Sequence, residues 1–218
     1  MNRSSLYRWL ENPLVYSLSQ SILLPGARQM LAAPYRRLFG ASRGTVLDVG
    51  CGPELSTPSP PEGVIVGLDI NPRYVTQYRR GSPASQGSSN RLGVTGSAAQ
   101  LPFADGRFDE SRSVGLFHHL PDEVVRQTVL EMCRVVRGSG RVIIVDNVWP
   151  RSALCRPLAW ATRRLDRGQW VRSEADLKAV VAAASPAVRW SIGRMTYTLT
   201  GLELLLMEGQ VEALKESP

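Results

Sequence analysis

From Thr45 onward, short apolar runs alternate with segments whose apolar residues repeat at helical spacing. Each run has the length of a buried strand, and no hairpin turn joins one run to the next. We expect five strands, at 45–50, 63–70, 91–98, from 108 onward and at 140–148, with helices at 72–80 and 122–136. Strands that alternate with helices in this way predict a parallel, doubly wound α/β sheet.

The chain after Pro150 predicts an extension of this sheet. A basic, tryptophan-containing stretch leads to a helix at 173–184, with Ser173 as its N-cap. Two apolar runs, at 187–192 and 201–209, predict strands that add an antiparallel pair to the sheet edge. The expected fold is a Rossmann-like, seven-stranded, mostly parallel α/β sheet with helices on both faces.

Residues 5–39 carry apolar and aromatic side chains at roughly helical spacing, interrupted near Pro13, Pro25 and Pro34. Because proline breaks helices, we expect two or three short helices. Residues 1–40 would form a helical cap on a domain that spans 41–218. The mixture of tryptophan, leucine and arginine is also typical of a helix in a membrane interface, and the two roles are compatible.

Composition narrows the choice of partner and compartment. A net charge of +7 permits anionic partners, but the arginines are scattered and no RNA-binding signature is present, so no nucleic-acid partner is expected. The three cysteines lack CxxC spacing, which argues against a disulfide scaffold or a zinc site and favours a reducing cytoplasm. No run is apolar enough to cross a bilayer and no secretory signal is recognised. We expect a cytoplasmic protein, with membrane association through the N-terminal helices left open.

The stretch VLDVGCGPE, residues 46–54, places an acid and two glycines at the end of a buried strand. Parallel sheets bind ligands at the carboxyl ends of their strands, where glycines let the backbone approach the ligand. The P-loop pattern GxxxxGK[ST] is absent. Leu55 stands where a dinucleotide loop needs its last small residue. Neither of these two nucleotide loops is therefore predicted.

Two carboxylates favour an adenosyl ligand that also carries an amino acid. Asp48 stands two residues before Gly50, where its charge repels phosphate and attracts an ammonium group. Asp69 ends the next strand, twenty-one positions later, and can accept hydrogen bonds from ribose hydroxyls. An ammonium group and a ribose on one ligand suggest S-adenosylmethionine.

In these residues the chain resembles the class I S-adenosylmethionine-dependent methyltransferases. It is most similar to the type 11 group, which includes ubiquinone- and menaquinone-biosynthesis-like enzymes. VLDVGCG is similar to the first family motif, GLDINPRYV to the second and GSAAQLPFADGRFD to the third. LFHHLPDE and EMCRVVRGSGRVII are similar to the fourth and fifth. The resemblance runs from about Thr45 to Val148, roughly half of the chain.

The resemblance implies S-adenosylmethionine as the cofactor and S-adenosylhomocysteine as its product. It implies roles for eleven residues: Asp48, Gly50, Cys51 and Gly52 on the methionine side, Glu54 near the ammonium group, Asp69 on the ribose, Ile70 on the adenine face, Ser97 and Ala98 at the adenine edge, and Ser113 and Leu116 near the methionine portion. Cys51 would be a small filler of the loop. The chain departs from the family pattern at Glu54, the usual third glycine, and at Ser97, the usual acid. The fourth strand, DESRSV, is also more polar than a buried strand normally is.

His118 and His119 are candidates for the catalytic base. An imidazole titrates near neutrality and can take a proton from an acceptor hydroxyl, but packing at a helix start explains a histidine here equally well. Adjacent side chains point in different directions, so we expect at most one to face the site. No carboxylate or cysteine stands at ligand spacing beside them, so no metal is expected.

The acceptor side is expected after Val148, where the family builds its acceptor pocket. Trp149, Trp160 and Trp170 are candidates for that pocket, although core packing explains each as well. Arg163, Arg164 and Arg167 predict a solvated face.

The expected activity is methyl transfer to a small, hydrophobic or lipid-linked acceptor, at oxygen. The alternatives are a catalytically weak adenosyl-binding partner subunit and a nucleic-acid methyltransferase. The acceptor and the oligomeric state are not encoded in any motif of the chain.

Overall fold

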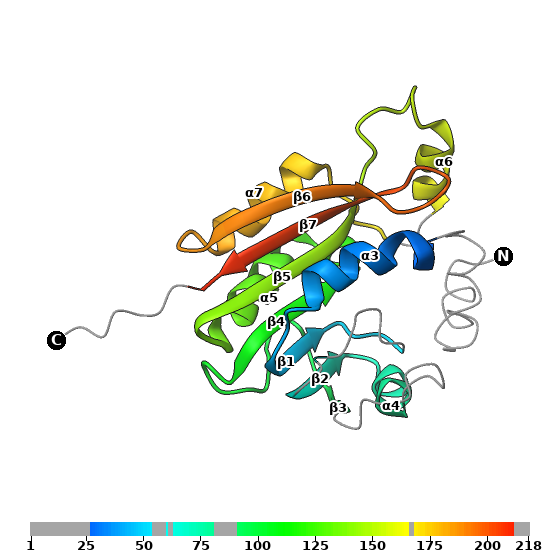
Figure 1. Ribbon diagram of the computed structural model, residues 1–218. Coiled ribbons are helices and arrows are strands. Elements are labelled where there is room, and N and C mark those ends of the chain that lie inside the picture. Colours follow the sequence, from blue (N-terminus) through cyan, green and yellow to red (C-terminus); the bar gives the residue numbers. More distant parts are fainter. Residues whose placement is uncertain (1–26, 54–59, 61–62, 81–90, 166–167, 212–218) are drawn as a thin grey trace.

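The computed structural model describes residues 27–53, 60, 63–80, 91–165 and 168–211. In this part of the chain, seven strands form one sheet in the order β3-β2-β1-β4-β5-β7-β6 (Figure 1). The strands are β1 (Gly44–Val49), β2 (Gly63–Asp69), β3 (Arg91–Thr95), β4 (Phe108–Val114), β5 (Val136–Val148), β6 (Arg189–Thr196) and β7 (Glu203–Gln210). β7 is antiparallel to both β5 and β6, and the other pairs are parallel. The predicted seven-stranded, mostly parallel sheet with an antiparallel edge pair is confirmed.

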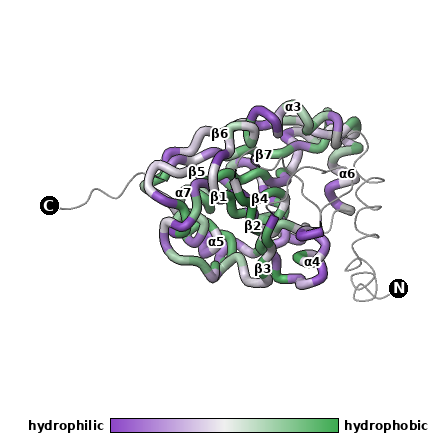
Figure 2. The backbone as a smooth tube through the Cα atoms, turned by 60° about the horizontal axis from the view of Figure 1, so that its bottom comes forward, coloured by the Kyte–Doolittle hydropathy of each residue, from purple (hydrophilic) through white to green (hydrophobic). Residues whose placement is uncertain are grey.

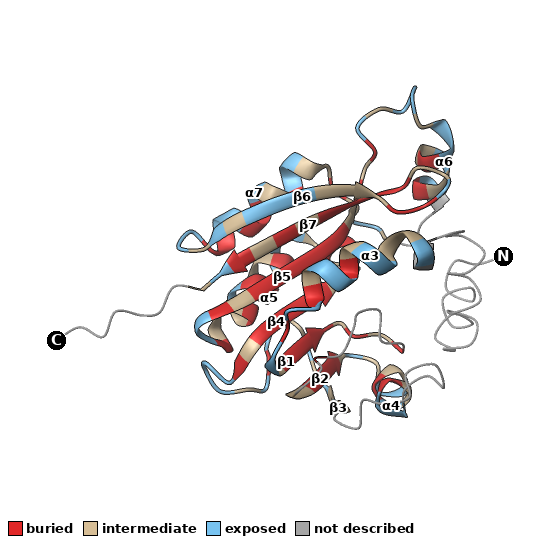
Figure 3. Cartoon of the chain, viewed as in Figure 1, coloured by how far each residue is buried: buried red, intermediate tan, exposed pale blue. Residues whose placement is uncertain are grey.

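Helices cover both faces of this sheet. They are α3 (Ala27–Phe39), α4 (Pro72–Arg80), α5 (Asp122–Arg134), α6 (Pro157–Leu165) and α7 (Glu174–Ala184), with a short 3₁₀ helix, η2 (Phe117–His119). α5 and α7 lie together on one face, and α3 crosses the opposite face over β5 and β4 (Figure 1). Figure 2 shows that hydrophobic residues concentrate in the central strands, and Figure 3 that these strands are the most buried part of the molecule.

The order of the strands decides where a ligand can bind. β2, β1, β4 and β5 run parallel, so the segments that follow Val49, Asp69, Val114 and Val148 all leave the same edge of the sheet. The strand order reverses at β1, because β2 and β3 extend the sheet on one side of it and β4 and β5 on the other. Doubly wound sheets bind ligands at such a switch point. The glycine motif and the histidine pair are therefore brought to one edge.

The N-terminal prediction was wrong at Pro34, because α3 continues through it. A proline inside a helix costs one backbone hydrogen bond, and packing compensates for that loss here. Tyr35 and Phe39 on α3 are buried against Ile143 and Val145 of β5. Tyr35 and Phe39 therefore attach α3 to the core of the domain. Residues 1–26 of the expected cap lie outside the described residues.

Strand β4 is polar and nevertheless almost completely buried. Glu110, Ser111, Arg112 and Ser113 are each at most 2% exposed. Glu110 accepts a hydrogen bond from the Ser42 hydroxyl at 2.7 Å and forms an ion pair with Arg141 at the same distance. Buried polar groups are tolerated when they are paired in this way, so the charges of the strand are compensated inside the fold.

The helix expected at 173–184 is confirmed as α7, and Ser173 is its N-cap. The Ser173 hydroxyl accepts the backbone N–H of Asp176 at 3.2 Å. Among the described helices, none combines the length and apolar character that a bilayer-spanning segment needs.

Candidate functional site

The loop after β1 adopts a backbone conformation that requires its two glycines. Gly50 and Gly52 have φ angles of 70° and 62°, in the left-handed region that other residues rarely adopt. A Cβ atom on Gly50 would lie 2.8 Å from the side chain of Leu116, whereas one on Gly52 would meet no atom of the described residues within 4 Å. The loop is therefore packed at Gly50 and open in front of Gly52.

Asp69, the last residue of β2, holds this loop in place. Its Oδ2 accepts the backbone N–H of Gly52 at 3.0 Å, and its Oδ1 accepts that of Asn71 at 2.8 Å. Burial raises the pKa of Asp69, and these backbone hydrogen bonds lower it. The next side chain, Ile70, is 78% exposed. A carboxylate, an exposed apolar residue and the open side of a glycine loop thus lie side by side.

Asp48 lies inside the fold, beneath the loop. Its side chain is 4% exposed, and the Tyr78 hydroxyl on α4 donates to Oδ2 at 3.4 Å. Burial raises the pKa of this carboxyl group, and the charge of Arg112 on the neighbouring strand lowers it. The predicted attraction between Asp48 and a ligand ammonium group would therefore act from below the loop.

The other two side chains expected in this loop are Cys51 and Glu54. The Cys51 thiol is 6% exposed and lies against Gly67 of β2, and burial raises its pKa. This placement agrees with the small filler expected at Cys51. Glu54 lies outside the described residues.

The segment after β3 approaches the same place. The backbone N–H of Gly96 donates to the carbonyl of Asp69 at 3.0 Å, which brings Ser97 and Ala98 next to the end of β2. The Ser97 hydroxyl accepts the N–H of Ala99 at 3.3 Å, so its oxygen stabilises a local turn. Ser97 is exposed and Ala98 is half-buried.

Two residues from the end of β4 close the other side of the loop. The Ser113 hydroxyl is buried and donates to the carbonyl of Val49 at 3.0 Å, which joins β4 to the start of the loop. Leu116 packs against Gly50. Ser113 thus acts through the backbone, whereas Leu116 is half-buried and forms a wall of the loop.

The two histidines of η2 have different surroundings. His118 is 5% exposed, and its Nδ1 lies 2.7 Å from Oδ1 of Asp146 at the end of β5. The same carboxylate accepts the backbone N–H groups of Phe117 and His118. His119 is exposed, and its ring centroid lies 4.0 Å from that of His118. A carboxylate that orients the Nδ1 side of an imidazole leaves Nε2 for proton transfer.

Four residues that the sequence analysis did not select surround this pair: Asp146, Asn147, Arg163 and Tyr197. The Asn147 amide nitrogen lies 3.3 Å from His118 Nε2. Its Oδ1 accepts hydrogen bonds from the Tyr197 hydroxyl at 2.9 Å and from Arg163 at 3.1 Å. Asp146 and Asn147 stand just before Val148, the last residue of the apolar strand β5, much as Asp69 stands at the end of β2, and that similarity is a sequence signal for them. Nothing in the sequence marks Arg163 or Tyr197.

The expected solvated face was wrong for Arg163. This side chain is 2% exposed because α6 folds over the end of β5 and directs it toward Asn147. Arg164 is exposed as expected, and Arg167 lies outside the described residues. The helical register explains the difference, since successive side chains on an α-helix are rotated by about 100° and can lie one inside and one outside.

The three tryptophans separate into a pair and a single exposed residue. The rings of Trp149 and Trp160 lie 4.6 Å apart between centroids, and Trp149 Nε1 donates to the carbonyl of Val171 at 2.9 Å. Trp170 is 46% exposed, and its backbone N–H donates to the carbonyl of His118. Two of the tryptophans are therefore packed together and one lies at the surface, and their place in an acceptor pocket stays a prediction.

The residues present fit an adenosyl ligand with a charged amino acid portion. Asp69 offers carboxylate oxygens at a strand end, Ile70 offers an apolar surface beside it, and Gly52 leaves space for a ligand to approach the backbone. Asp48 lies beneath the loop, buried and hydrogen-bonded to the Tyr78 hydroxyl.

Comparison with known proteins gives consistent results. Residues 47–144 match the family model described as a methyltransferase domain. The chain is 31% identical over 130 residues to the methyltransferase GfsG of Streptomyces halstedii, covering 58% of this chain and 46% of that protein. It is 32% identical over 111 residues to a demethylmenaquinone methyltransferase of Desulfitobacterium hafniense, covering 49% and 43%. The chain thus spans less than half the length of these curated relatives.

Solved structures agree on the fold. The crystal structure of the YcgJ protein from Bacillus subtilis superimposes with a TM-score of 0.60 at 18% identity, covering 85% of this chain and 99% of that one. The glycine loop, the strand-end acid, the sheet order and the family match lead to one assignment. Residues 47–144 carry a methyltransferase domain, and the relatives and the shared fold support a class I S-adenosylmethionine-dependent methyltransferase, a family whose cofactor is S-adenosylmethionine.

Proposed function

We propose that this protein transfers a methyl group from S-adenosylmethionine to an oxygen atom of a small hydrophobic or lipid-linked acceptor. The observation that carries the proposal is the His118–Asp146 pair, whose Nδ1 and Oδ1 atoms lie 2.7 Å apart. The pair follows Leu116, which packs on the glycine loop, so a base stands next to the expected methyl donor.

The cofactor would be held by the residues of the loop and the strand end. Asp69 would accept hydrogen bonds from the ribose, Ile70 would cover the adenine, and the Gly52 backbone would lie against the methionine portion. Bound S-adenosylmethionine supplies a methyl group that its sulfonium already activates. The protein therefore has to align the acceptor with that methyl group and exclude water, more than it has to supply covalent chemistry.

An oxygen acceptor would lose its proton to Nε2 of His118 as the new carbon–oxygen bond forms. Asp146 would fix the imidazole tautomer by accepting from Nδ1–H, and its charge would stabilise the imidazolium that results. His118 is 5% exposed and its Nε2 lies 3.3 Å from the Asn147 amide nitrogen, so the acceptor oxygen would take the place of that amide group. His119, exposed beside it, would contact the acceptor entrance and not the transferred proton.

Two features support a hydrophobic acceptor. The segments expected to face the acceptor carry aromatic side chains: Trp149 packs against Trp160, and the Tyr197 hydroxyl donates to Asn147. A relative of similar sequence is a demethylmenaquinone methyltransferase, so an acceptor of quinone or phenol type is the first class to test.

Mass spectrometry of lipid and aqueous cell extracts, incubated with the protein and S-adenosylmethionine labelled in its methyl group, tests the proposal. The expected result is one labelled hydrophobic product that depends on the protein, with release of S-adenosylhomocysteine. An Asp146→Asn variant serves as the matched control, because it preserves shape and should bind cofactor while forming little product. Cofactor binding without any labelled product, from any extract, would instead favour the adenosyl-binding partner subunit.

A further inference from the structure

Three leucines at one end of the molecule are among the most exposed apolar side chains in the described residues. Leu154 is 95% exposed, Leu199 79% and Leu158 67%. Leu154 precedes α6, Leu158 lies in its first turn, and Leu199 lies in the connection between β6 and β7. We call these three residues the leucine surface. Large exposed apolar residues that gather in one place commonly mark an interaction site.

The two segments that carry the leucine surface are fixed against each other. Arg156 Nη1 donates to the Thr196 hydroxyl at 2.8 Å and to the carbonyl of Gly201 at 3.0 Å. Gly201 also lies close to Ala159 of α6. Figure 1 shows α6 and the β6–β7 connection side by side at the same end of the molecule. The leucines are therefore held on one rigid surface.

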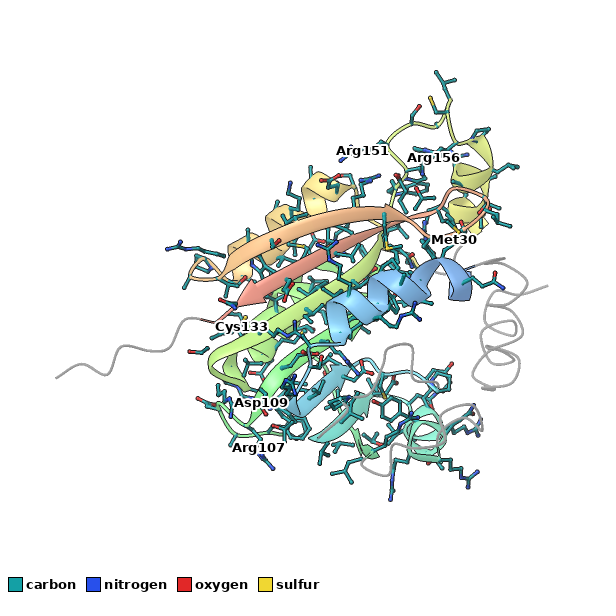
Figure 4. The ribbon with its side chains drawn as sticks, viewed as in Figure 1. Met30, Arg107, Asp109, Cys133, Arg151 and Arg156 are labelled. Atoms are coloured by element: carbon teal, nitrogen blue, oxygen red, sulfur yellow. The ribbon has the colours of Figure 1, made fainter. Side chains whose placement is uncertain are left out.

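Basic side chains border this surface. Arg151 and Arg156, both labelled in Figure 4, lie at this end of the molecule, and Arg164 is exposed on α6. Arg151 and Arg156 are themselves ion-paired: Glu174 pairs with Arg151 and Arg194, and Glu203 with Arg156 and Arg194. These two carboxylates therefore meet three arginines, and the exposed Arg164 adds a further positive charge. Apolar residues within a basic border, on a chain of net charge +7, complement a membrane with anionic headgroups.

The leucine surface is continuous with the acceptor side of the candidate site. α6 carries Arg163, and the β6–β7 connection begins with Tyr197, and both donate to Asn147 beside His118. The two elements that carry the exposed leucines thus also carry the side chains that position Asn147. A bilayer in contact with this surface would lie beside the entrance to the site.

We propose that the leucine surface, Leu154, Leu158 and Leu199, docks the protein on bilayers that contain anionic lipids. The delivery of a lipid-linked acceptor rests on the proposed function. Docking on the bilayer requires neither cofactor nor acceptor. The leucines enter the headgroup region while the arginines contact phosphate groups. An acceptor with an apolar tail then keeps that tail in the bilayer and offers its polar end to the site.

Vesicle flotation with the full-length protein tests the proposal. The probes are vesicles of phosphatidylcholine alone and of phosphatidylcholine with phosphatidylglycerol, without cofactor. The wild-type protein is expected to float with the anionic vesicles and much less with the neutral ones. Combined Leu154→Ser, Leu158→Ser and Leu199→Ser changes should weaken binding at least about tenfold, because three apolar anchors are lost.

A matched control comes from two leucines elsewhere on the surface. Leu92 on β3 and Leu130 on α5 are each 54% exposed and lie far from α6 (Figures 1 and 2). Leu92→Ser with Leu130→Ser should leave flotation unchanged. Arg151→Gln with Arg164→Gln should reduce the preference for anionic vesicles. Far-ultraviolet circular dichroism and calorimetry with S-adenosylhomocysteine verify that each variant is folded.

Three outcomes would overturn the proposal. These are failure of the wild-type protein to bind anionic vesicles, equal binding by the triple leucine variant, and equal loss in the control variant. A wild-type dimer that the triple variant converts to monomer, with no vesicle binding, would assign the surface to a second copy of the chain. Failure of the proposed function is distinguishable, because the protein would still float with vesicles but label no product.

Discussion

Asp48 of β1 and Arg112 of β4 are register partners in the parallel sheet, and both side chains are almost completely buried, at 4% and 0% exposure. Arg112 also lies 3.7 Å from Glu110 and 5.0 Å from the ring centroid of Phe39. The acid of the glycine motif thus has a buried cation beside it within the fold. This relationship links the cofactor loop to α3 through one side chain.

Replacement of Arg112 should destabilise the protein and make its stability more dependent on pH. Arg112→Met leaves buried carboxylates without their cation, which costs on the order of 3 kcal/mol. Burial already raises the pKa of Asp48, and removal of the arginine raises it further. An acid with a raised folded-state pKa loses stability as pH increases, so the loss should grow above about pH 4.

Urea unfolding of the wild-type and Arg112→Met proteins at several pH values measures this effect. The double variant Arg112→Met with Asp48→Asn serves as the control, since it removes the charge of Asp48 as well. It should recover part of the lost stability at neutral pH. An equal loss at every pH, with no recovery in the double variant, would show that Arg112 acts only by filling space.

Asp69 should dominate cofactor affinity. Asp69→Ala removes the carboxylate expected on the ribose and also the acceptor of the Gly52 N–H, so two contributions are lost. Hydrogen bonds to charged groups contribute about 1.5–3 kcal/mol each, which predicts at least about a tenfold weaker Kd for S-adenosylhomocysteine. Isothermal titration calorimetry with S-adenosylhomocysteine measures the Kd of the wild-type and variant proteins.

Glu54→Ala provides the comparison for Asp69→Ala, because Glu54 follows the loop and is expected only near the ammonium group. Its effect on Kd should be smaller. Asp69→Asn should lie between the two, since the amide keeps one oxygen that can accept from Gly52. A larger loss in Glu54→Ala than in Asp69→Ala would contradict the assignment of Asp69 to the ribose.

Asp146→Asn should lower kcat with little change in cofactor affinity. Proton transfer by a positioned side chain contributes about 10²–10⁴-fold to rate, and Asp146 orients the imidazole that would carry it. Phe117 and His118 donate their backbone N–H groups to different oxygens of Asp146, and the asparagine oxygen can keep the shorter of these bonds, that from Phe117, so η2 should stay folded. Steady-state kinetics on the acceptor found by labelling measures the change.

His119→Ala is the internal control for this prediction, because His119 stacks on His118 but is exposed. It should reduce kcat much less than His118→Ala does. If His118→Ala and Asp146→Asn lower thermal stability but leave kcat intact, the pair serves packing alone. That outcome would leave packing at a helix start, the alternative role predicted from the sequence, as the role of His118.

The strands, the helices and the cofactor loop were predictable because each depends on local pattern. Apolar runs such as 140–148 can only be buried, and the acid at position 69 follows such a run directly. Asp146 was missed although it stands in the same relation to its strand. Its partner His118 is 28 positions away, and only the pairing of β4 with β5 brings them together.

The burial of Arg112 and Arg163 could not be predicted from the local sequence pattern. Arg112 and Arg163 have ordinary neighbours in the sequence, and each becomes buried because a distant element covers it. α3 packs over Arg112 through Phe39, and β5 presents Asn147 to Arg163. Likewise α3 continues through Pro34 because the sheet below stabilises the helix more than the lost hydrogen bond costs.

The three cysteines should differ strongly in reactivity. Cys155 is exposed, whereas Cys51 is buried and Cys133 is partly buried. Burial raises the pKa of Cys133 to about 11 and that of Cys51 further, and the negative charges of Asp48 and Asp69 add to the effect at Cys51. The thiolate is the reactive form of cysteine. The Cys155 thiol should therefore react quickly with a disulfide reagent at about pH 8, and the Cys51 and Cys133 thiols should react slowly. Cys155→Ser should remove the fast phase, and unfolding in urea should expose all remaining thiols. A fast phase that survives in Cys155→Ser and disappears when S-adenosylhomocysteine is added would mean that the loop opens at Cys51, and that the packed arrangement beneath the cofactor is not the resting state.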